Sequence, residues 1–481
     1  MSRNYRGGPP VRTLGDPARI LALDVLLQVS EEGAFANLTL PKALREMQRK
    51  DSRFSFRDSA FASEVVYGTL RWQGYLDTVL ASYCTRPLAS LDTVVLELLR
   101  MGAYQLLFMR VPDHAAVSET VDIARSRTHE GGAKLVNAVL RAITRADENE
   151  IESIFAQLPG DEQIAARTSH PVWMVRSVRE ALVKHGGDGD DVEVALLANN
   201  ETPEVNLVAR PHLISTNELA SEVEDILDRE TSRSDLSPYA VVIEGGDPGA
   251  LPSVRSGEAA VQDQGSQFAA ILLAEAPIDG SDEKWLDLCA GPGGKTALLA
   301  ALAPEGTSIL ANEVSAKRAG LVVRSVRALD NVSVQTGDGR HIGNAGQFDR
   351  VLIDAPCSGI GALRRRPESR WRHHEEDLEQ LLPLQKSLFD AGIEAARSGG
   401  LIAWVTCTPQ VEETLDQVDM AMSRGDVELL DIRSLAHIAA PKVFDAPALD
   451  SPDDSLVSRT IQLWPHVHGS DAMFIALLRK R

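Results

Sequence analysis

Two cysteines in the C-terminal half of the chain stand in short motifs that can do covalent chemistry. Cys357 lies in "DAPCSGIG" (354–361) and Cys407 lies in "WVTCTPQ" (404–410), and each follows an apolar run typical of a buried strand. A thiolate is a good nucleophile, but free cysteine also packs as a small buried hydrophobe. The two thiols are therefore candidates for nucleophilic catalysis, with a structural role in the core as the alternative.

A carboxylate accompanies the first thiol. Asp354 precedes Cys357 by three residues, and Pro356 restricts the backbone directly before the thiol. Because the carboxyl ends of parallel strands meet at one edge of a sheet, we expect Asp354, Cys357 and Cys407 to lie together. Independent burial of two structural cysteines would not explain why both follow strands, so the pattern favours catalysis.

A glycine-rich turn in "LDLCAGPGGKT" (286–296) predicts a strand, a ligand-binding turn and a helix. A P-loop requires glycine five residues before the Gly-Lys pair, where this chain has Cys289. The GxGxxG pattern also fails, because Lys295 and Thr296 follow Gly294. The turn is therefore typical neither of a P-loop ATPase nor of a dinucleotide binder, and a tight turn without a ligand stays open.

Two acidic residues indicate a nucleoside site beside this turn. Glu313 ends the second predicted strand, 22 residues after Gly291, and Asp338 ends the third. Nucleotide-binding α/β folds place a carboxylate on ribose hydroxyls at about 20 residues from the turn. Each acid alone is typical of a protein surface, but together they predict a site that suits S-adenosylmethionine better than NAD or ATP.

The elements that position these residues form a multidomain chain. Apolar runs alternate with helical stretches from residue 284 onward, which predicts an α/β, Rossmann-like doubly wound parallel sheet within a domain at 258–481. Helical periodicity predicts an all-α domain at 17–145, after a flexible basic N-terminus at 1–16. Residues 146–257 are interpreted as linker helices and a small α+β connector. Because every cofactor motif lies in 258–481, we expect that fragment to bind the cofactor alone.

Charge and composition limit the class of protein. The formal net charge is −20, but residues 1–145 carry 19 Lys and Arg against 15 Asp and Glu, and "LRRRPESRWR" (363–372) is locally basic. Such a basic, aromatic segment can bind the phosphates of a nucleic acid, although a solvated charged loop is an equal alternative. The four cysteines form no CxxC, and no apolar run of 18 residues occurs. We expect a cytoplasmic monomer with reduced thiols, no metal and no membrane segment.

The motifs "LDLCAGPGGKT", "DAPCSGIG" and "VTCT" together resemble the RsmB/Sun family of S-adenosylmethionine-dependent RNA cytosine-5 methyltransferases. The resemblance extends to "VQDQGSQ" (261–267), to the arginine-rich segment and to "LWPHVHGSDAMFIALLR" (463–479). The helical region with "LVNAVLR" resembles the NusB-like RNA-binding domain of the bacterial small-subunit ribosomal RNA branch. Thr408 stands where the family usually has serine, "VEET" where it often has Glu-Asn-Glu, and "DAMF" where it has Asp-Gly-Phe-Phe. None of these departures removes a catalytic group.

The resemblance implies a class I methyltransferase fold and roles for individual residues. Cys407 would be the nucleophile, Cys357 would help product release, and Asp354 would lie at the junction of cofactor and base. Glu313 would contact the ribose and Asp338 the adenine. The cofactor-binding turn would comprise Cys289, Ala290, Gly291, Pro292, Gly293, Gly294 and Lys295, and the RNA-contacting residues would be Arg364, Arg365, Arg366, Arg370, Trp371 and Arg372.

This chemistry explains the need for a thiol. Carbon 5 of cytosine is a poor nucleophile until a thiolate adds to carbon 6, and the target base must leave its stack to be reached. Single-stranded loops of structured RNA are the expected substrate, in small-subunit (16S) ribosomal RNA. Two alternatives stay open: an enzyme acting on transfer RNA or large-subunit RNA, and a non-catalytic RNA-binding assembly or antitermination factor.

Overall fold

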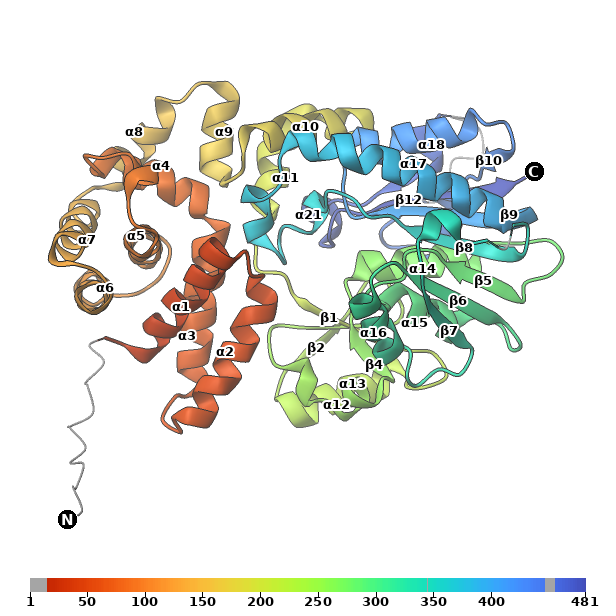
Figure 1. Ribbon diagram of the computed structural model, residues 1–481, viewed down its shortest axis with the longest axis horizontal. Coiled ribbons are helices and arrows are strands. Elements are labelled where there is room, and N and C mark those ends of the chain that lie inside the picture. Colours follow the sequence, from red (N-terminus) through yellow and green to blue (C-terminus); the bar gives the residue numbers. More distant parts are fainter. Residues whose placement is uncertain (1–14, 344, 446–454) are drawn as a thin grey trace, which may run out of the picture. The chain divides into compact units, whose positions relative to one another are not determined.

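The computed structural model describes residues 15–343, 345–445 and 455–481 (Figure 1). Residues 1–14 of the predicted basic N-terminus lie outside the described residues. The chain forms two compact units, one made of the chain up to Val175 together with Arg365–Arg372, the other of Arg176–Arg364 and His373–Arg481. The chain therefore passes between the units three times.

The first unit is helical, as the periodicity predicts. Ser55 caps α3 through a capping box with Asp58, and the αL conformation of Gly33 ends α1. Apolar side chains of the helices share one core. Two further helices follow residue 145, the boundary predicted from sequence. The helices are α1 (Pro17–Glu32), α2 (Ala36–Lys50), α3 (Phe56–Arg71), α4 (Gln73–Tyr83), α5 (Thr93–Leu107), α6 (Asp113–Arg127), α7 (Glu130–Ile143), α8 (Glu148–Ala156) and α9 (Gly160–Thr168).

The second unit begins within α10 and contains a small antiparallel sheet of order β2-β3-β1-β4. Its βαββαβ connectivity and strand order give a ferredoxin-like unit, more specific than the predicted α+β connector. Both faces are covered, because Leu207 and Val241 pack with α12 while Val208 joins the core around α14 (Gln264–Glu275). The elements are α10 (Val172–Lys184), α11 (Val192–Ala198), β1 (Val205–Ala209), α12 (Thr216–Leu227), β2 (Thr231–Arg233), β3 (Ala240–Ile243), α13 (Pro252–Ser256) and β4 (Ala259–Val261).

The larger sheet has the predicted doubly wound parallel core, in the order β9-β8-β5-β6-β7. Two antiparallel strands that the sequence analysis missed, β12 and β10, extend it beyond β9. The strand order reverses between β5 and β8, which is where such folds bind ligands. The strands are β5 (Lys284–Asp287), β6 (Ser308–Glu313), β7 (Val332–Thr336), β8 (Phe348–Asp354), β9 (Ala396–Thr406), β10 (Val427–Leu429), β11 (Ile461–Gln462) and β12 (Phe474–Lys480).

Helices cover both faces of this sheet. Alternate residues of one strand enter different cores: Val405 packs with α14 and α15, whereas Trp404 packs with α17 and stacks on Phe389. This division is what period-2 alternation in a doubly covered strand requires. The helices are α14 (Gln264–Glu275), α15 (Gly294–Leu302), α16 (Ala316–Ser325), α17 (Leu378–Ala395), α18 (Leu415–Met422), α19 (Arg433–Ala439), α20 (Leu456–Arg459) and α21 (Pro465–His468).

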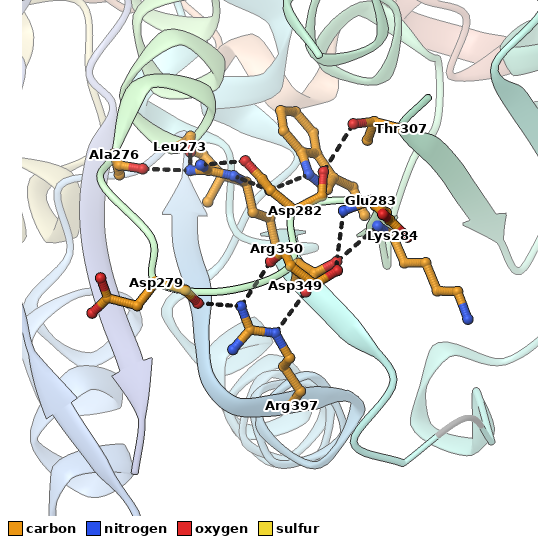
Figure 2. A network of polar contacts seen from close by, with 12 residues as sticks. Leu273, Ala276, Asp279, Asp282, Glu283, Lys284, Thr307, Asp349, Arg350 and Arg397 are labelled. Atoms are coloured by element: carbon orange, nitrogen blue, oxygen red, sulfur yellow. Dashed lines mark hydrogen bonds and ion pairs between the residues drawn. The ribbon is translucent and has the colours of Figure 1, made fainter. Parts of the chain in front are cut away.

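A polar network joins the amino ends of the central strands, away from the predicted chemistry (Figure 2). Asp349 at the start of β8 accepts a hydrogen bond from Arg397 Nε of β9 at 2.6 Å. The neighbouring Arg350, 4% exposed, donates to Asp282 at 2.8 Å and to the carbonyl of Leu273 at 2.5 Å. The network fixes the base of the sheet whose opposite edge carries the site.

We expect Arg350→Met to lower the free energy of unfolding by about 3 kcal/mol, because two buried carbonyls lose their donor and Asp282 keeps only one of its donors, Trp285 Nε1. Chemical denaturation of the wild type and the variant measures the difference. A change below about 0.5 kcal/mol, the size typical of a surface pair, would contradict this role.

Candidate active site

The structure brings the two predicted thiols together. Cys357 follows β8 and Cys407 follows β9, its neighbour in the sheet, and their Sγ atoms lie 3.4 Å apart. Both residues are partly exposed at the carboxyl edge of the sheet. A base that reaches this edge would meet both sulfur atoms at once.

Asp354 connects this thiol pair to the glycine-rich turn. Its carboxylate lies 2.8 Å from Lys295 Nζ at the start of α15. Burial opposes the charge of Lys295, but the nearby Asp354 carboxylate outweighs it and raises the pKa of the lysine. A thiolate at Cys407 contributes in the same direction, so Lys295 attracts negative charge on either group.

The glycine-rich turn closes tightly on Glu313 at the end of β6. The N–H of Gly291 donates to Glu313 Oε2 at 3.1 Å, and a Cβ at Gly291 would lie 2.1 Å from that oxygen. Gly293 has a positive φ of 106° and leads into α15. Cys289, Gly294 and Lys295 are half-buried, Ala290 is buried and Pro292 is exposed.

Asp338 follows β7, the third strand along this edge. Its carboxylate is partly exposed and accepts a hydrogen bond from Arg340 at 2.6 Å. This interaction with Arg340 lowers the pKa of Asp338 to about 2. A carboxylate therefore follows each of the strands β6, β7 and β8, as the sequence predicts.

Comparisons with known proteins identify the family to which this chain belongs. A family model described as 16S rRNA methyltransferase RsmB/F matches residues 273–479, and a NusB family model matches residues 16–145. Ribosomal RNA small subunit methyltransferase B of Cronobacter sakazakii is 32% identical over 453 residues, which cover 92% of this chain and 98% of that protein. The chain belongs to the RsmB/F family.

Further comparisons show a similar chain along the whole length and a shared fold. A Mycobacterium tuberculosis protein is 42% identical over 480 residues, which cover 98% of each chain. One crystal structure shares the fold with a TM-score of 0.76 at 23% identity, covering 97% of this chain and 100% of its own. A second, of a methyltransferase homologue from Pyrococcus horikoshii, has a TM-score of 0.54 at 24% identity and covers 67% of this chain and 100% of that one. This RsmB/F protein is an S-adenosylmethionine-dependent RNA methyltransferase with a NusB-like helical domain.

The residues of this edge fit the cofactor of the RsmB/F family. Carboxylates at Glu313, Asp338 and Asp354 lie at the carboxyl ends of three strands of this sheet, and the glycine-rich turn carries one lysine, itself paired with Asp354. Such a set of acceptors suits a ligand with hydroxyls and positive charges, as S-adenosylmethionine has, and would repel a polyphosphate. Across the ranges that the structure describes, no group of three or more His, Cys, Asp or Glu is placed to hold a metal ion. No described helix is long and apolar enough to cross a membrane.

One buried acid in this site, Asp287, was not predicted from the sequence. Asp287, the last residue of β5, is 1% exposed and accepts a hydrogen bond from Thr296 Oγ1 at 2.6 Å. Burial raises its pKa to about 7. Its position in the sequence, inside an apolar strand and directly before the glycine-rich turn, could have indicated a buried acid.

The raised pKa of Asp287 predicts a pH-dependent contribution to stability. Folding raises the pKa from 3.8 to about 7, so the folded state holds a proton that the unfolded state releases. The stability from the protonated carboxyl is complete below about pH 4 and is lost as the pH rises through about 7. We expect the free energy of unfolding of the wild type to fall relative to Asp287→Asn across this window. Denaturation at several pH values measures the difference, which would stay constant if Asp287 had an ordinary pKa.

The surroundings of Cys357 favour its neutral form. The hydrogen bond to Cys407 and burial together raise the pKa of Cys357 well above its ordinary value. Burial also raises the pKa of Cys289, the third thiol in this region. Cys357 therefore keeps its proton at neutral pH, which suits the neutral partner of the pair.

Part of the arginine-rich segment (363–372) is buried, whereas the sequence predicts an RNA-binding surface there. Arg364 is 5% exposed and donates to the carbonyl of Gly469 at 3.1 Å. Arg370 is fully buried within the helical unit, where it donates to the carbonyl of Arg71, the last residue of α3, at 2.8 Å. Their burial argues against phosphate contacts by these two residues, because their guanidinium groups already serve protein carbonyls.

The rest of the segment also packs within the helical unit. Arg372 donates to the carbonyl of Ala34 at 2.6 Å, and Trp371 lies against Gly74. Arg365 is half-buried, while Arg366 is exposed and lies over the ring of Phe35. An arginine that caps a helix carboxyl end looks the same in sequence as one that binds RNA. Because Arg366 is exposed, it remains a predicted contact for an RNA phosphate.

Proposed function

We propose that this enzyme methylates carbon 5 of a cytosine in small-subunit ribosomal RNA through a covalent adduct with Cys407. The single observation that carries the proposal is the pair of sulfur atoms 3.4 Å apart beside the Asp354–Lys295 ion pair. Two thiols at one site match a reaction that must both form and break a bond to the base. The small-subunit substrate rests on the names of relatives that match along most of their length.

The covalent step follows from the electronic structure of cytosine. The Cys407 thiolate adds to carbon 6, the double bond between carbons 5 and 6 opens, and its electron pair makes carbon 5 nucleophilic. S-adenosylmethionine would supply the electrophilic methyl group: the bond from carbon 5 to the methyl forms as the sulfonium–methyl bond breaks, with S-adenosylhomocysteine as the leaving group. Loss of the carbon 5 proton then returns an electron pair to the ring, and the bond from carbon 6 to Cys407 breaks.

The other residues hold the base and assist release. In the proposed complex the Asp354 carboxylate, balanced by Lys295, accepts a hydrogen bond from the amino group of the base. A proton held by Asp354 would be shared with N3 as negative charge builds on the ring. Cys357, which keeps its proton, is the group best placed to assist expulsion of the neighbouring Cys407. The proton of carbon 5 passes to water at this step, while Cys357 donates its own proton to the departing Cys407 sulfur.

The proposal is tested by mapping 5-methylcytosine in ribosomal RNA from cells with and without the gene. The expected result is one site in small-subunit RNA that loses its methyl group in the deletion strain and regains it with the wild-type gene but not with Cys407→Ala. Loss of a site only in transfer RNA or large-subunit RNA would overturn the substrate assignment. Unchanged methylation everywhere would favour a non-catalytic assembly factor.

The helical unit offers a separate surface for RNA. Lys42, Arg45 and Arg49 are exposed on one face of α2, at the helical spacing i, i+3, i+7, opposite Leu40 and Met47 that pack toward the core. Residues 36–57 carry six basic against two acidic side chains, whereas the remaining described residues up to 145 carry ten against thirteen. The positive excess of the described helical region therefore lies around α2.

We expect changing Lys42, Arg45 and Arg49 together to glutamine to weaken RNA binding and make its salt dependence shallower. Each lost phosphate contact on single strands reduces the slope by about 0.7, so three contacts reduce it by about 2. Titrations at several salt concentrations measure this. A matched control changes Lys134, Arg141 and Arg145 to glutamine, which removes the same charge from and beside α7. Equal slopes for both triple variants would mean that α2 is only a solvated face.

A further inference from the structure

Two buried side chains hold the peptide groups on either side of Cys357. The N–H of Ser358 donates to Glu413 Oε1 at 2.8 Å, and Gln385 Nε2 donates to the carbonyl of Pro356 at 2.9 Å. Gln385 Nε2 also donates to Glu413 Oε1 at 2.8 Å. The Glu413–Gln385 pair therefore closes a bridge around the backbone of the thiol.

This bridge is fixed by its own surroundings. Glu413 and Gln385 are both fully buried, one at the end of a short 3-10 turn (Val411–Glu413) and the other on α17. The carbonyl of Glu413 accepts a hydrogen bond from Trp404 Nε1 at 3.2 Å, and that indole stacks on Phe389. A buried carboxylate is costly unless it is hydrogen-bonded, so its presence here needs a reason beyond packing.

The same network extends to the residue after Cys407. The hydroxyl of Ser358 lies within hydrogen-bond distance of the Glu413 carboxylate and of Thr408 Oγ1, the latter at 3.1 Å. A hydroxyl has one proton, and the carboxylate is the stronger acceptor, so Thr408 donates to Ser358. Thr408 keeps the hydroxyl of the serine that is usual in the family. The network thus joins the positions that follow both thiols.

We propose that Glu413, acting with Gln385, is a positioning residue that holds the Cys357 sulfur against Cys407. Glu413 touches neither sulfur itself and acts through the backbone of Ser358. Its role in product release rests on the proposed function, but the thiol geometry that it maintains does not. Without the carboxylate, the buried N–H and hydroxyl of Ser358 lose their acceptor, and the loop after β8 moves to find another.

The geometry is tested in the full chain with dibromobimane, a reagent that bridges two neighbouring thiols with loss of two HBr. Wild type is expected to yield a peptide pair bridged between Cys357 and Cys407. Glu413→Ala removes the acceptor of three hydrogen bonds and is expected to reduce the bridging rate at least about tenfold. Glu413→Gln, which keeps an acceptor oxygen, should restore part of the rate. Glu412→Ala is the matched control in the same turn and should bridge like wild type.

A second measurement links the geometry to catalysis. With RNA and S-adenosylmethionine, Glu413→Ala should accumulate a denaturant-resistant RNA adduct at Cys407, as expected for Cys357→Ala. Reduced bridging with no adduct in any variant, Cys357→Ala included, would overturn the proposed function and leave the positioning role intact. Wild-type bridging in a folded Glu413→Ala would overturn the positioning role. If Glu413→Ala does not fold, the bridging rate of Gln385→Ala tests the positioning role instead, because Gln385 holds the other peptide group beside Cys357.

Discussion

Cys407→Ala is expected to abolish methyl transfer and to form no covalent complex with RNA, because the base is never activated. Cys357→Ala is expected to attack and transfer methyl, then to stall with RNA attached through Cys407. The physical reason is the placement of one protonated thiol 3.4 Å from the other, where it can assist expulsion of the neighbouring sulfur. Gel electrophoresis under denaturing conditions detects the stalled complex, which needs S-adenosylmethionine to accumulate.

Each alternative gives a different pattern. If both cysteines were structural, either alanine would lower thermal stability and neither would yield an adduct. If the roles were reversed, the stalled band would appear with Cys407→Ala. Cys84→Ala is a suitable control, because this partly exposed thiol lies in the helical unit. It should methylate like wild type and give no stalled band.

The arrangement of this site was predictable because it follows from topology. Parallel strands must end at a common edge, so residues that follow the strands meet there whatever lies between them in the sequence. Asp354, Cys357 and Cys407 were found in this way, and the resemblance to a known family then gave each one a role. The placement of these three residues at one edge does not depend on the structure of the loops between the strands.

The residues that support the thiols were not predictable by this reasoning. Glu413 and Gln385 lie in a 3-10 turn and a helix, and their sequence context is that of ordinary surface residues. Only the fold shows that both are fully buried around Cys357. Burial of a polar side chain depends on what packs over it, and local sequence does not contain that information.

Residues 258–481 are predicted to bind the cofactor as an isolated fragment, but two of their regions pack against residues outside that fragment. Strand β4 pairs with β1, and Val208 of β1 belongs to the core beneath α14. Residues 365–372 pack within the helical unit, where Arg370 is fully buried. Cutting the chain at residue 258 would expose both regions to solvent. The fragment 258–481 therefore contains all the cofactor motifs but is not expected to fold independently.

Gly291→Ala is expected to weaken S-adenosylmethionine binding by about 5- to 150-fold, the equivalent of about 1–3 kcal/mol of overpacking. The new methyl group would stand 2.1 Å from Glu313 Oε2 and 2.9 Å from Arg318 Nε. Glu313 has little room to move, because it is 3% exposed and its other oxygen accepts the N–H of Ser315 at 2.9 Å. Relief therefore requires displacement of the turn itself, which carries the predicted cofactor contacts. Isothermal titration calorimetry measures the affinity.

The control for this prediction is Gly320→Ala, because a Cβ there meets no atom closer than 3.9 Å and alanine favours the α16 helix. It should bind the cofactor like wild type. Glu313→Ala provides the complementary variant, since it removes the nearer clash partner and the predicted ribose contact. The second clash partner, Arg318, has a long side chain that is 52% exposed and can move aside. The double variant Gly291→Ala with Glu313→Ala should bind no more weakly than Glu313→Ala alone, because the clash and the contact share one carboxylate. Additive losses in the double variant would mean that Gly291 and Glu313 act on the cofactor separately.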